Sequence, residues 1–234
     1  MRRTLYILLL LLLPLTALVA QERKLQNRPY IDYRRFHYGF YVGLHMQDLE
    51  LANNNFVTAD GEQWYADVDT YTPGFTVGVL ADLRLNDFVA LRLLPGMYFG
   101  DKRVVFRELN SGKIERQQIK STYIAVPIQA KITAERFNNY RPYVVAGLSP
   151  MFDLTIKKQR PLLVKSFDCM VEVGLGCDFY LPFFKLNPEL KFSFSFIDIL
   201  QKERNDLLDA NYLKFTQSVD KAVAKMIALS FYFE

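Results

Sequence analysis

The stretch FDCMVEVGLGCDFYL, residues 167–181, decides the fold because apolar and polar residues alternate along it. Apolar side chains and both cysteines occupy its odd-numbered positions, whereas Asp168, Glu172 and Asp178 fall on even-numbered ones. Successive side chains of a β-strand point to opposite faces, so a period of two predicts a strand with one apolar face and one mixed face. The stretch exceeds the roughly 9–11 residues with which a tilted strand crosses a bilayer.

Seven other stretches show the same alternation, and with the first they make about eight predicted strands. They cover His37–Met46, Phe75–Leu85, Val89–Phe99, Ile124–Ile132, Val144–Phe152, Leu186–Phe196 and Ile227–Phe233. Within lipid every backbone polar group must find a partner in the protein, so a spanning sheet has to close on itself. The predicted fold class is therefore all-β, a closed antiparallel transmembrane β-barrel of about eight strands with its apolar faces turned outward.

The gaps between these strands alternate in length. Long gaps, at about Gln47–Pro73, Gly100–Ser121 and Leu200–Lys225, alternate with shorter gaps along the chain. Outer-membrane barrels have short periplasmic turns and longer extracellular loops, so the alternation favours that class. A soluble lipocalin-like barrel, with its apolar positions turned inward around a ligand, is the alternative. Within the last gap, Asp206–Leu208 and Val219–Val223 have roughly helical spacing, which predicts that part of it is helical.

The composition bounds the function. Of the 234 residues, 50% are hydrophobic and 15% aromatic, which excludes a disordered chain. The formal net charge of +4 is too small to indicate a nucleic-acid surface. Two cysteines and two histidines leave little room for metal chemistry, and no metal or cofactor site is predicted. Cys169 and Cys177 lie roughly 26 Å apart on one predicted strand, at about 3.3 Å per residue, which is too far for a disulfide.

The N-terminus indicates export. A basic start precedes the apolar stretch Leu5–Val19, and Ala20 suits a cleavage site, so residues 1–20 are interpreted as a signal peptide cleaved after about Ala20. An uncleaved anchor helix is the alternative. We predict a periplasmic N-terminal segment at residues 21–36, an outer-membrane β-barrel domain at residues 37–234, and a location in the cell outer membrane.

The second face of each predicted strand points into the barrel. At about eight strands the lumen is just wide enough for packed side chains. The inward positions include four acids and four bases, which could neutralise one another in a buried network. They are Asp82, Arg84, Arg92, Lys131, Glu172, Asp178, Glu189 and Lys191. We predict that this lumen charge network is structural, with a proton or solute relay as the alternative, and assign no catalytic residue.

One histidine raises an enzymatic alternative. Some small barrels are lipid hydrolases that use a serine, a histidine and an acid near the outer rim. His45, at the outer end of the first predicted strand, is the only candidate for that histidine. The hypothesis predicts a change in lipid A composition when His45 is substituted. An ordinary interfacial role is the simpler interpretation, and we expect the protein not to be an enzyme.

Seven short stretches carry a resemblance to a known family. They are HYGFYVGLHM (37–46), PGFTVGVLADLRLN (73–86), LRLLPGM (91–97), VPIQAK (126–131), RPY (141–143), EVGLGCDFY (172–180) and PELKFS (188–193). In combination they resemble the PorT family of outer-membrane β-barrel proteins from the Bacteroidota. The final Glu234 departs from the usual barrel ending in an aromatic residue. The resemblance implies a component of the type IX secretion system, needed to export cargo with C-terminal sorting domains and, in motile relatives, for gliding.

These observations give one expected function and its alternatives. We expect a non-enzymatic secretion component whose partners are outer-membrane lipid and other secretion-system proteins, with no nucleic acid bound. The pore must then belong to another subunit. The long polar segments Asn53–Tyr71, Arg103–Lys120 and Lys202–Lys225 are the candidate contact surfaces. The alternatives are a general barrel for adhesion, envelope integrity or ligand binding, and the lipid A-modifying enzyme.

Overall fold

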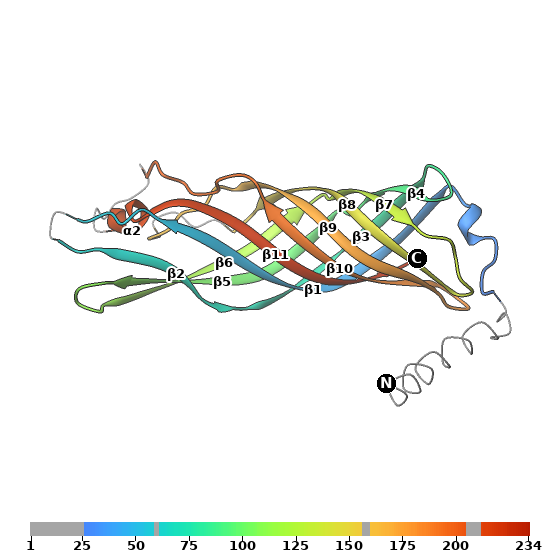
Figure 1. Ribbon diagram of the computed structural model, residues 1–234, viewed down its shortest axis with the longest axis horizontal. Helices are drawn as coiled ribbons and strands as arrows, with labels where there is room; N and C mark the ends of the chain where they lie inside the picture. The colour runs from blue at the N-terminus through green and yellow to red at the C-terminus, as the bar shows by residue number, and fades with distance from the viewer. Residues whose placement is uncertain (1–25, 59–60, 156–159, 205–211) are drawn as a thin grey trace, which may run out of the picture.

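The computed structural model describes residues 26–58, 61–155, 160–204 and 212–234 as one elongated barrel (Figure 1). Its elements are β1 (Phe36–Asn53), β2 (Trp64–Tyr71), β3 (Pro73–Arg84), β4 (Val89–Leu93), β5 (Gly96–Glu108), β6 (Ile114–Ala125), β7 (Ile128–Thr133), β8 (Tyr140–Asp153), β9 (Phe167–Tyr180), β10 (Lys185–Ser195), β11 (Val219–Phe233), the 3₁₀ helix η2 (Ile31–Tyr33) and the helix α2 (Leu213–Gln217). Across these ranges no helix has the length and apolar character needed to span a membrane.

The strands form a closed ring. Because β2 leads into β3, β4 into β5 and β6 into β7, they make eight wall strands, all antiparallel to their neighbours. β1 pairs with β3 on one side and with β11 on the other, which closes the ring. The predicted barrel of about eight strands is therefore confirmed. Two wall strands are interrupted at Pro95 and Pro127 because proline has no N–H for the ladder.

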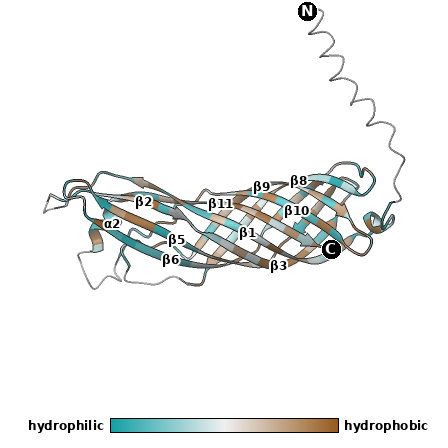
Figure 2. Ribbon diagram, turned by 90° about the horizontal axis from the view of Figure 1, so that it is seen from below, coloured by the Kyte–Doolittle hydropathy of each residue, from teal (hydrophilic) through white to brown (hydrophobic). Residues whose placement is uncertain are grey.

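The outer surface of the wall is apolar around its middle. On β1 the side chains of Tyr38, Phe40, Val42, Leu44 and Met46 are each at least 41% exposed. Hydrophobic and hydrophilic residues alternate along the strands, as the bands of brown and teal in Figure 2 show. An exposed apolar surface of this extent suits contact with lipid, and it excludes a lipocalin-like barrel with its apolar positions inside.

The two ends of the barrel differ. The short turns at residues 85–88, 134–139 and 181–184 lie at the same end as η2 and the C-terminus (Figure 1). The long connections lie at the other end, where β2, the outer parts of β5 and β6, and α2 project beyond the apolar belt. Since outer-membrane barrels have short periplasmic turns, the first end is periplasmic and the second is extracellular. We call the projecting part the extracellular extension.

The extension corrects the prediction of long polar loops. Residues 47–53 continue β1, and β2 occupies much of the remaining gap before Pro73. Most of Gly100–Ser121 forms a hairpin of β5 and β6, paired from Gly96 opposite Ala125 to Arg107 opposite Ile114. Strand pairing thus continues past the membrane, because these residues keep the period-two alternation while their outward faces become polar.

The predicted helix is also displaced. Val219–Val223 belongs to β11. Val219 and Ala222 are buried there and lie opposite Asn53 and Leu51 of β1. The helical spacing of this segment was misleading, because small and apolar residues at these positions fill the barrel interior. The helix α2 lies just before it, at Leu213–Gln217. The other predicted helical group, Asp206–Leu208, lies outside the described residues.

Candidate functional site

The predicted lumen charges are brought together inside the periplasmic half of the barrel. Seven of the eight are at most 4% exposed. They are Asp82, Arg92, Lys131, Glu172, Asp178, Glu189 and Lys191. Arg84 differs, because it lies at the periplasmic rim, partly exposed and paired with Asp87. The set is thus a buried network with one residue at its margin.

Arg92 is the centre of this network. Its Nη1 lies 2.8 Å from Oε2 of Glu189 and its Nε 3.5 Å from Oδ2 of Asp82. The Tyr232 hydroxyl donates to Glu189 Oε1 at 2.9 Å. The guanidinium also lies over the rings of Tyr143 and Tyr232, at 5.3 and 5.0 Å from their centroids. One buried cation is thereby held by two carboxylates and two aromatic faces.

Two further ion pairs lie on either side of Arg92. Lys131 Nζ is 2.8 Å from Oδ1 of Asp178, and Lys191 Nζ is 3.5 Å from Oε2 of Glu172. Gln129 donates to the same Glu172 oxygen at 2.5 Å. Because each buried charge has an opposite charge within ion-pair distance, part of the desolvation cost of the group is offset.

Sequence reasoning missed two members of the network, Lys185 and Glu234. Lys185 pairs with Asp178 at 3.7 Å and also contacts the carboxylate of Glu234. The period-two alternation could have revealed both residues. Lys185 shares the odd-numbered inward face of β10 with Glu189 and Lys191. Glu234, which departs from an aromatic chain end, continues the inward face that carries Tyr232.

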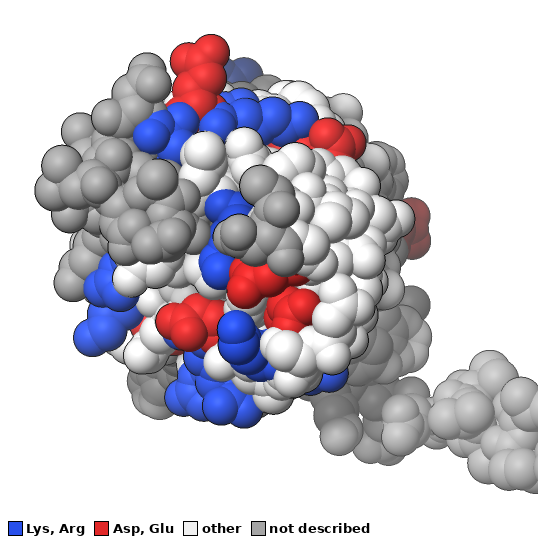
Figure 3. Space-filling view, turned by 90° about the vertical axis from the view of Figure 1, so that its left-hand side faces the viewer, with Lys and Arg blue, Asp and Glu red and all other residues white. Residues whose placement is uncertain are grey.

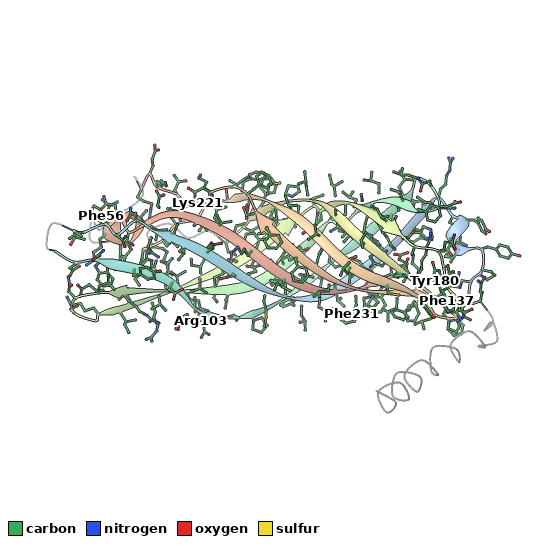
Figure 4. The ribbon with its side chains drawn as sticks, viewed as in Figure 1. Phe56, Arg103, Phe137, Tyr180, Lys221 and Phe231 are labelled. Carbon is green, nitrogen blue, oxygen red and sulfur yellow. The ribbon has the colours of Figure 1, made fainter. Side chains whose placement is uncertain are left out.

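The N-terminal segment covers the periplasmic mouth of the barrel. Nδ2 of Asn27 donates to the carbonyl of Tyr180 at 3.0 Å, and the hydroxyl of Tyr180 donates to Asp32 at 2.6 Å. Arg136 donates to Asp32 at 3.2 Å and lies over the Tyr180 ring at 3.6 Å. Tyr180 and Phe137 are labelled at this end in Figure 4. Residues 27–32 are thereby tied to the turn before β8 and to the end of β9.

His45 does not occupy the place that a rim hydrolase requires. Its side chain is 2% exposed and points into the barrel, where its ring lies 5.5 Å from that of Tyr98. Nε2 lies 3.1 Å from the amide nitrogen of Gln47. A lipid hydrolase must present its histidine to lipid, so the structure places His45 on the wrong side of the wall. His45 points inward because it lies on the face of β1 that the alternation predicts to face the lumen.

The extracellular half of the interior has different chemistry. It is filled by one apolar cluster from seven strands, the helix α2 and the connecting residues Leu162, Val164, Ile199 and Leu200. Phe106 and Val104 of β5 are fully buried there. The ring of Phe215 packs against those of Trp64 and Phe106, with centroids 4.9 and 4.8 Å apart. The extension therefore has a hydrophobic core of its own, continuous with the barrel.

Polar side chains cover the outside of the extension. Lysine and arginine side chains gather around its margin when it is viewed end-on, with acidic side chains among them (Figure 3). Glu62 accepts hydrogen bonds from Lys214 at 2.7 Å and from the Trp64 indole at 2.9 Å. These bonds, that from Lys214 above all, hold the pKa of Glu62 at about 2, well below its usual value. Glu62, just before β2, is thus tied to α2.

The three predicted contact segments meet in this extension. Asn53 Nδ2 donates to the carbonyl of Ala66, and the amide of Ala66 donates to Asn53, which joins β1 to β2. Lys214, in the third segment, contacts Glu62 in the first. Tyr212 and the β6 part of the second segment line a common cleft of about 280 Å³. The structure therefore places the described parts of these segments on one body.

Comparison with known proteins gives a family match. The profile of the outer membrane protein beta-barrel domain family matches residues 19–201. Ail of Yersinia pestis, solved with the heparin analogue sucrose octasulfate, is similar at 11% identity and a TM-score of 0.37, over 86% of this chain and 99% of that chain. Neisserial surface protein A is similar at 14% identity and a TM-score of 0.38, over 84% and 97%. The outer membrane protein AlkL, solved in DMPC bilayers, is similar at 11% identity and a TM-score of 0.39, over 92% and 94%. No curated protein matches the sequence.

Proposed function

The chain belongs to the outer membrane protein beta-barrel domain family, and from this premise we propose that it is a non-enzymatic component of a type IX secretion system. In that role it is needed for the export of cargo proteins with C-terminal sorting domains. The proposal extends the resemblance of the sequence to the PorT family. The lumen charge network has a structural role in it, which is to fill and neutralise the periplasmic half of the barrel.

The observation that carries the proposal is the extracellular extension. Its wall is built by β1, β2, β5, β6 and β11, and its interior is an apolar core. A barrel that only anchors itself in lipid has no need of such a body. Its polar outer face presents a rigid surface to other proteins at the cell exterior. Cargo export then depends on contacts of this surface, while the conducting pore belongs to another subunit.

Deleting the gene tests the role as a whole. We expect cargo with C-terminal sorting domains to disappear from the cell surface and the medium, while lipid A composition stays normal. An intact set of secreted proteins would refute the secretion role and favour a general barrel for adhesion or envelope integrity. Altered lipid A would instead support an enzyme. Mass spectrometry of secreted proteins and of lipid A separates the three outcomes.

Shortening the extension tests the surface itself. Each of the three segments Asn53–Tyr71, Arg103–Lys120 and Lys202–Lys225 is shortened in turn at its outer tip, and folding is followed by the heat-dependent shift of the barrel on a gel. We expect folded barrels with reduced cargo export. Phe183→Ser in a periplasmic turn is the matched control, because Phe183 is 91% exposed and lies at the other end. Normal export with all three shortened barrels would contradict the proposal.

A further inference from the structure

A cleft opens in the wall of the extension where β6 separates from β8. The two strands pair only from Tyr123 to Ala125. Further out, residues 153–155 and residues 160–164 lie along the free edge of β6 and are hydrogen-bonded to it. Thr155 Oγ1 donates to the carbonyl of Lys120 at 2.9 Å, and Gln117 exchanges two hydrogen bonds with the backbone of Leu162 at 2.8 and 2.9 Å. The cleft of about 280 Å³ lies along this seam.

Cations outnumber acids in the lining of the cleft. Lys120, Arg116 and Arg160 line it, against Glu115 and Asp153. Within the described residues, Lys120 and Arg160 have no carboxylate within ion-pair distance. Arg116 has only an exposed contact, at 4.0 Å, with an aspartate of β2 outside the cleft. Such pairs are weak, so the charge of all three side chains is open to an anion.

A buried acceptor faces the same cleft without a partner. Asp153 is 7% exposed, and its Oδ1 accepts hydrogen bonds from the amide and the hydroxyl of Thr155, at 2.8 and 2.9 Å. Its Oδ2 is buried and has no hydrogen-bond partner. Buried polar atoms are nearly always paired, so this oxygen indicates a donor that is supplied from outside the chain. A hydroxyl or amino group of a ligand would satisfy it.

The cleft begins at the outer boundary of the membrane. Phe152, the neighbour of Asp153, is 50% exposed on the lipid-facing side, and its ring lies 5.1 Å from that of Phe167. Aromatic rings of this kind mark the interface between lipid and water. Asp153, Thr155 and Lys120 follow directly beyond these rings, at the level of lipid headgroups. At this position the cleft is within reach of the headgroups of outer-leaflet lipids.

We propose that this cleft binds the phosphorylated sugar headgroup of an outer-leaflet glycolipid. The phosphate contacts Lys120 and Arg160, and a sugar hydroxyl or amino group donates to Oδ2 of Asp153. The volume is at the small end of ligand sites, which suits a single sugar ring with its phosphate. Charge-assisted hydrogen bonds from two cations favour phosphate over neutral sugars. This binding site is independent of the proposed secretion role.

The single tryptophan provides the signal for a test. Tyr212 lines the cleft, its ring lies 6.4 Å from that of Phe215, and Phe215 packs on Trp64. The full barrel, refolded in neutral detergent micelles, is mixed with lipid A carrying both phosphates, with dephosphorylated lipid A, or with soluble glucosamine 1-phosphate. Trp64 emission and native mass spectrometry report binding. We expect lipid A with phosphates to be retained and to shift the emission, and dephosphorylated lipid A to bind at least tenfold more weakly.

Three variants make the test specific. Lys120→Gln and Arg160→Gln each remove a cation from the cleft, and we expect about tenfold weaker retention of phosphorylated lipid A. Arg103→Gln is the control, because Arg103 is exposed on the neighbouring β5 and does not line the cleft (Figure 4). Equal retention of the two forms of lipid A would overturn the proposal. The same loss in Arg103→Gln would also overturn it, as would binding of soluble glucosamine 1-phosphate as tightly as that of phosphorylated lipid A, which would assign the cleft to a soluble sugar phosphate. The heat-dependent gel shift confirms that each variant is folded.

Discussion

In the periplasmic half of the barrel, charged and phenolic side chains fill the interior and apolar side chains cover the exterior. In the extracellular half the arrangement is reversed, with Phe106 and Val104 inside and Arg103 outside. The reversal occurs along single strands. On β1 the outward face changes from Met46 to Asp48, while the inward face is apolar again at Leu49.

The comparison shows how one wall serves two solvents. Within the membrane the apolar side chains contact lipid, so the interior can be polar provided that its charges are paired. Beyond the membrane, water contacts the wall, and the strands must bury their apolar side chains inside to be stable. The strand pairing is common to both halves, and only the polarity of the two faces is exchanged.

The largest effect is expected from the periplasmic half. Arg92→Met leaves Asp82 and Glu189 buried without their cation, and we expect a loss of about 3–5 kcal/mol in the free energy of unfolding. Urea unfolding of the refolded barrel in micelles measures it. The double variant Arg92→Met, Glu189→Met should recover part of this loss. Arg84→Met, at the partly exposed rim, is the control, and an equal loss there would argue against the network.

A smaller and more local effect is expected in the extracellular half. Phe106→Ala removes a fully buried ring, and we expect the extension to lose about 3 kcal/mol of stability. Trp64 emission should change at lower urea, while the gel shift of the barrel stays as in the parent protein. Leu109→Ala is the control, because Leu109 is 59% exposed. If both signals shift together, the two halves unfold as one unit and the distinction between them fails.

The periplasmic mouth tests whether the polar half depends on the N-terminal segment. Asp32→Ala removes the acceptor for Arg136 and for the Tyr180 hydroxyl, and we expect a loss of about 1 kcal/mol. Protease cleavage within residues 26–35 should become faster. Glu135→Ala, exposed on the neighbouring turn, should cleave at the parent rate. Unchanged cleavage in Asp32→Ala would show that this segment is held by other contacts.

The smallest effect is a pH dependence of the extension. The pKa of Glu62 is about 2 in the folded protein, below the usual value near 4.5, chiefly through the hydrogen bond from Lys214. A carboxyl whose pKa is lowered by folding contributes stability above the unfolded pKa and loses it as the pH falls through the folded pKa. Trp64 emission should therefore change between about pH 4.5 and pH 2. We expect Glu62→Gln to abolish this change, and a persistent transition in the variant would assign it to another carboxyl.

Much of the fold could be predicted because lipid imposes one simple pattern. The alternation in Phe167–Leu181 gives both the strand and the inward positions of Glu172 and Asp178. The extension could not be recognised in the same way, because its outward residues, such as Arg103, are polar and resemble those of a loop. The strand character of Val219–Val223 was hidden by small residues at helical spacing.

The candidate sites follow the same division. The charges of the network could be predicted because each one occupies an inward position of a predicted strand. Which charges pair across distant strands could not be predicted. Arg92 lies opposite Asp82 across the short β3–β4 turn, but its other partner, Glu189, is distant in the sequence and meets it only through the curvature of the ring. The cleft beside Lys120 depends on residues 153–155 and 160–164 lying along a strand edge that β8 leaves unpaired. No periodicity in the sequence encodes that contact.

The pairing of β1 with β11 has a consequence for how the barrel forms. Phe40 lies opposite Phe233, so the first and last wall strands make the closing seam. Contacts between residues so distant in sequence are slow to form because a long loop must be closed first. Until β11 arrives, β1 has an open edge that can pair with other chains. The barrel is therefore most exposed to aggregation before this seam closes, and a factor that shields β1 until then would act at that step.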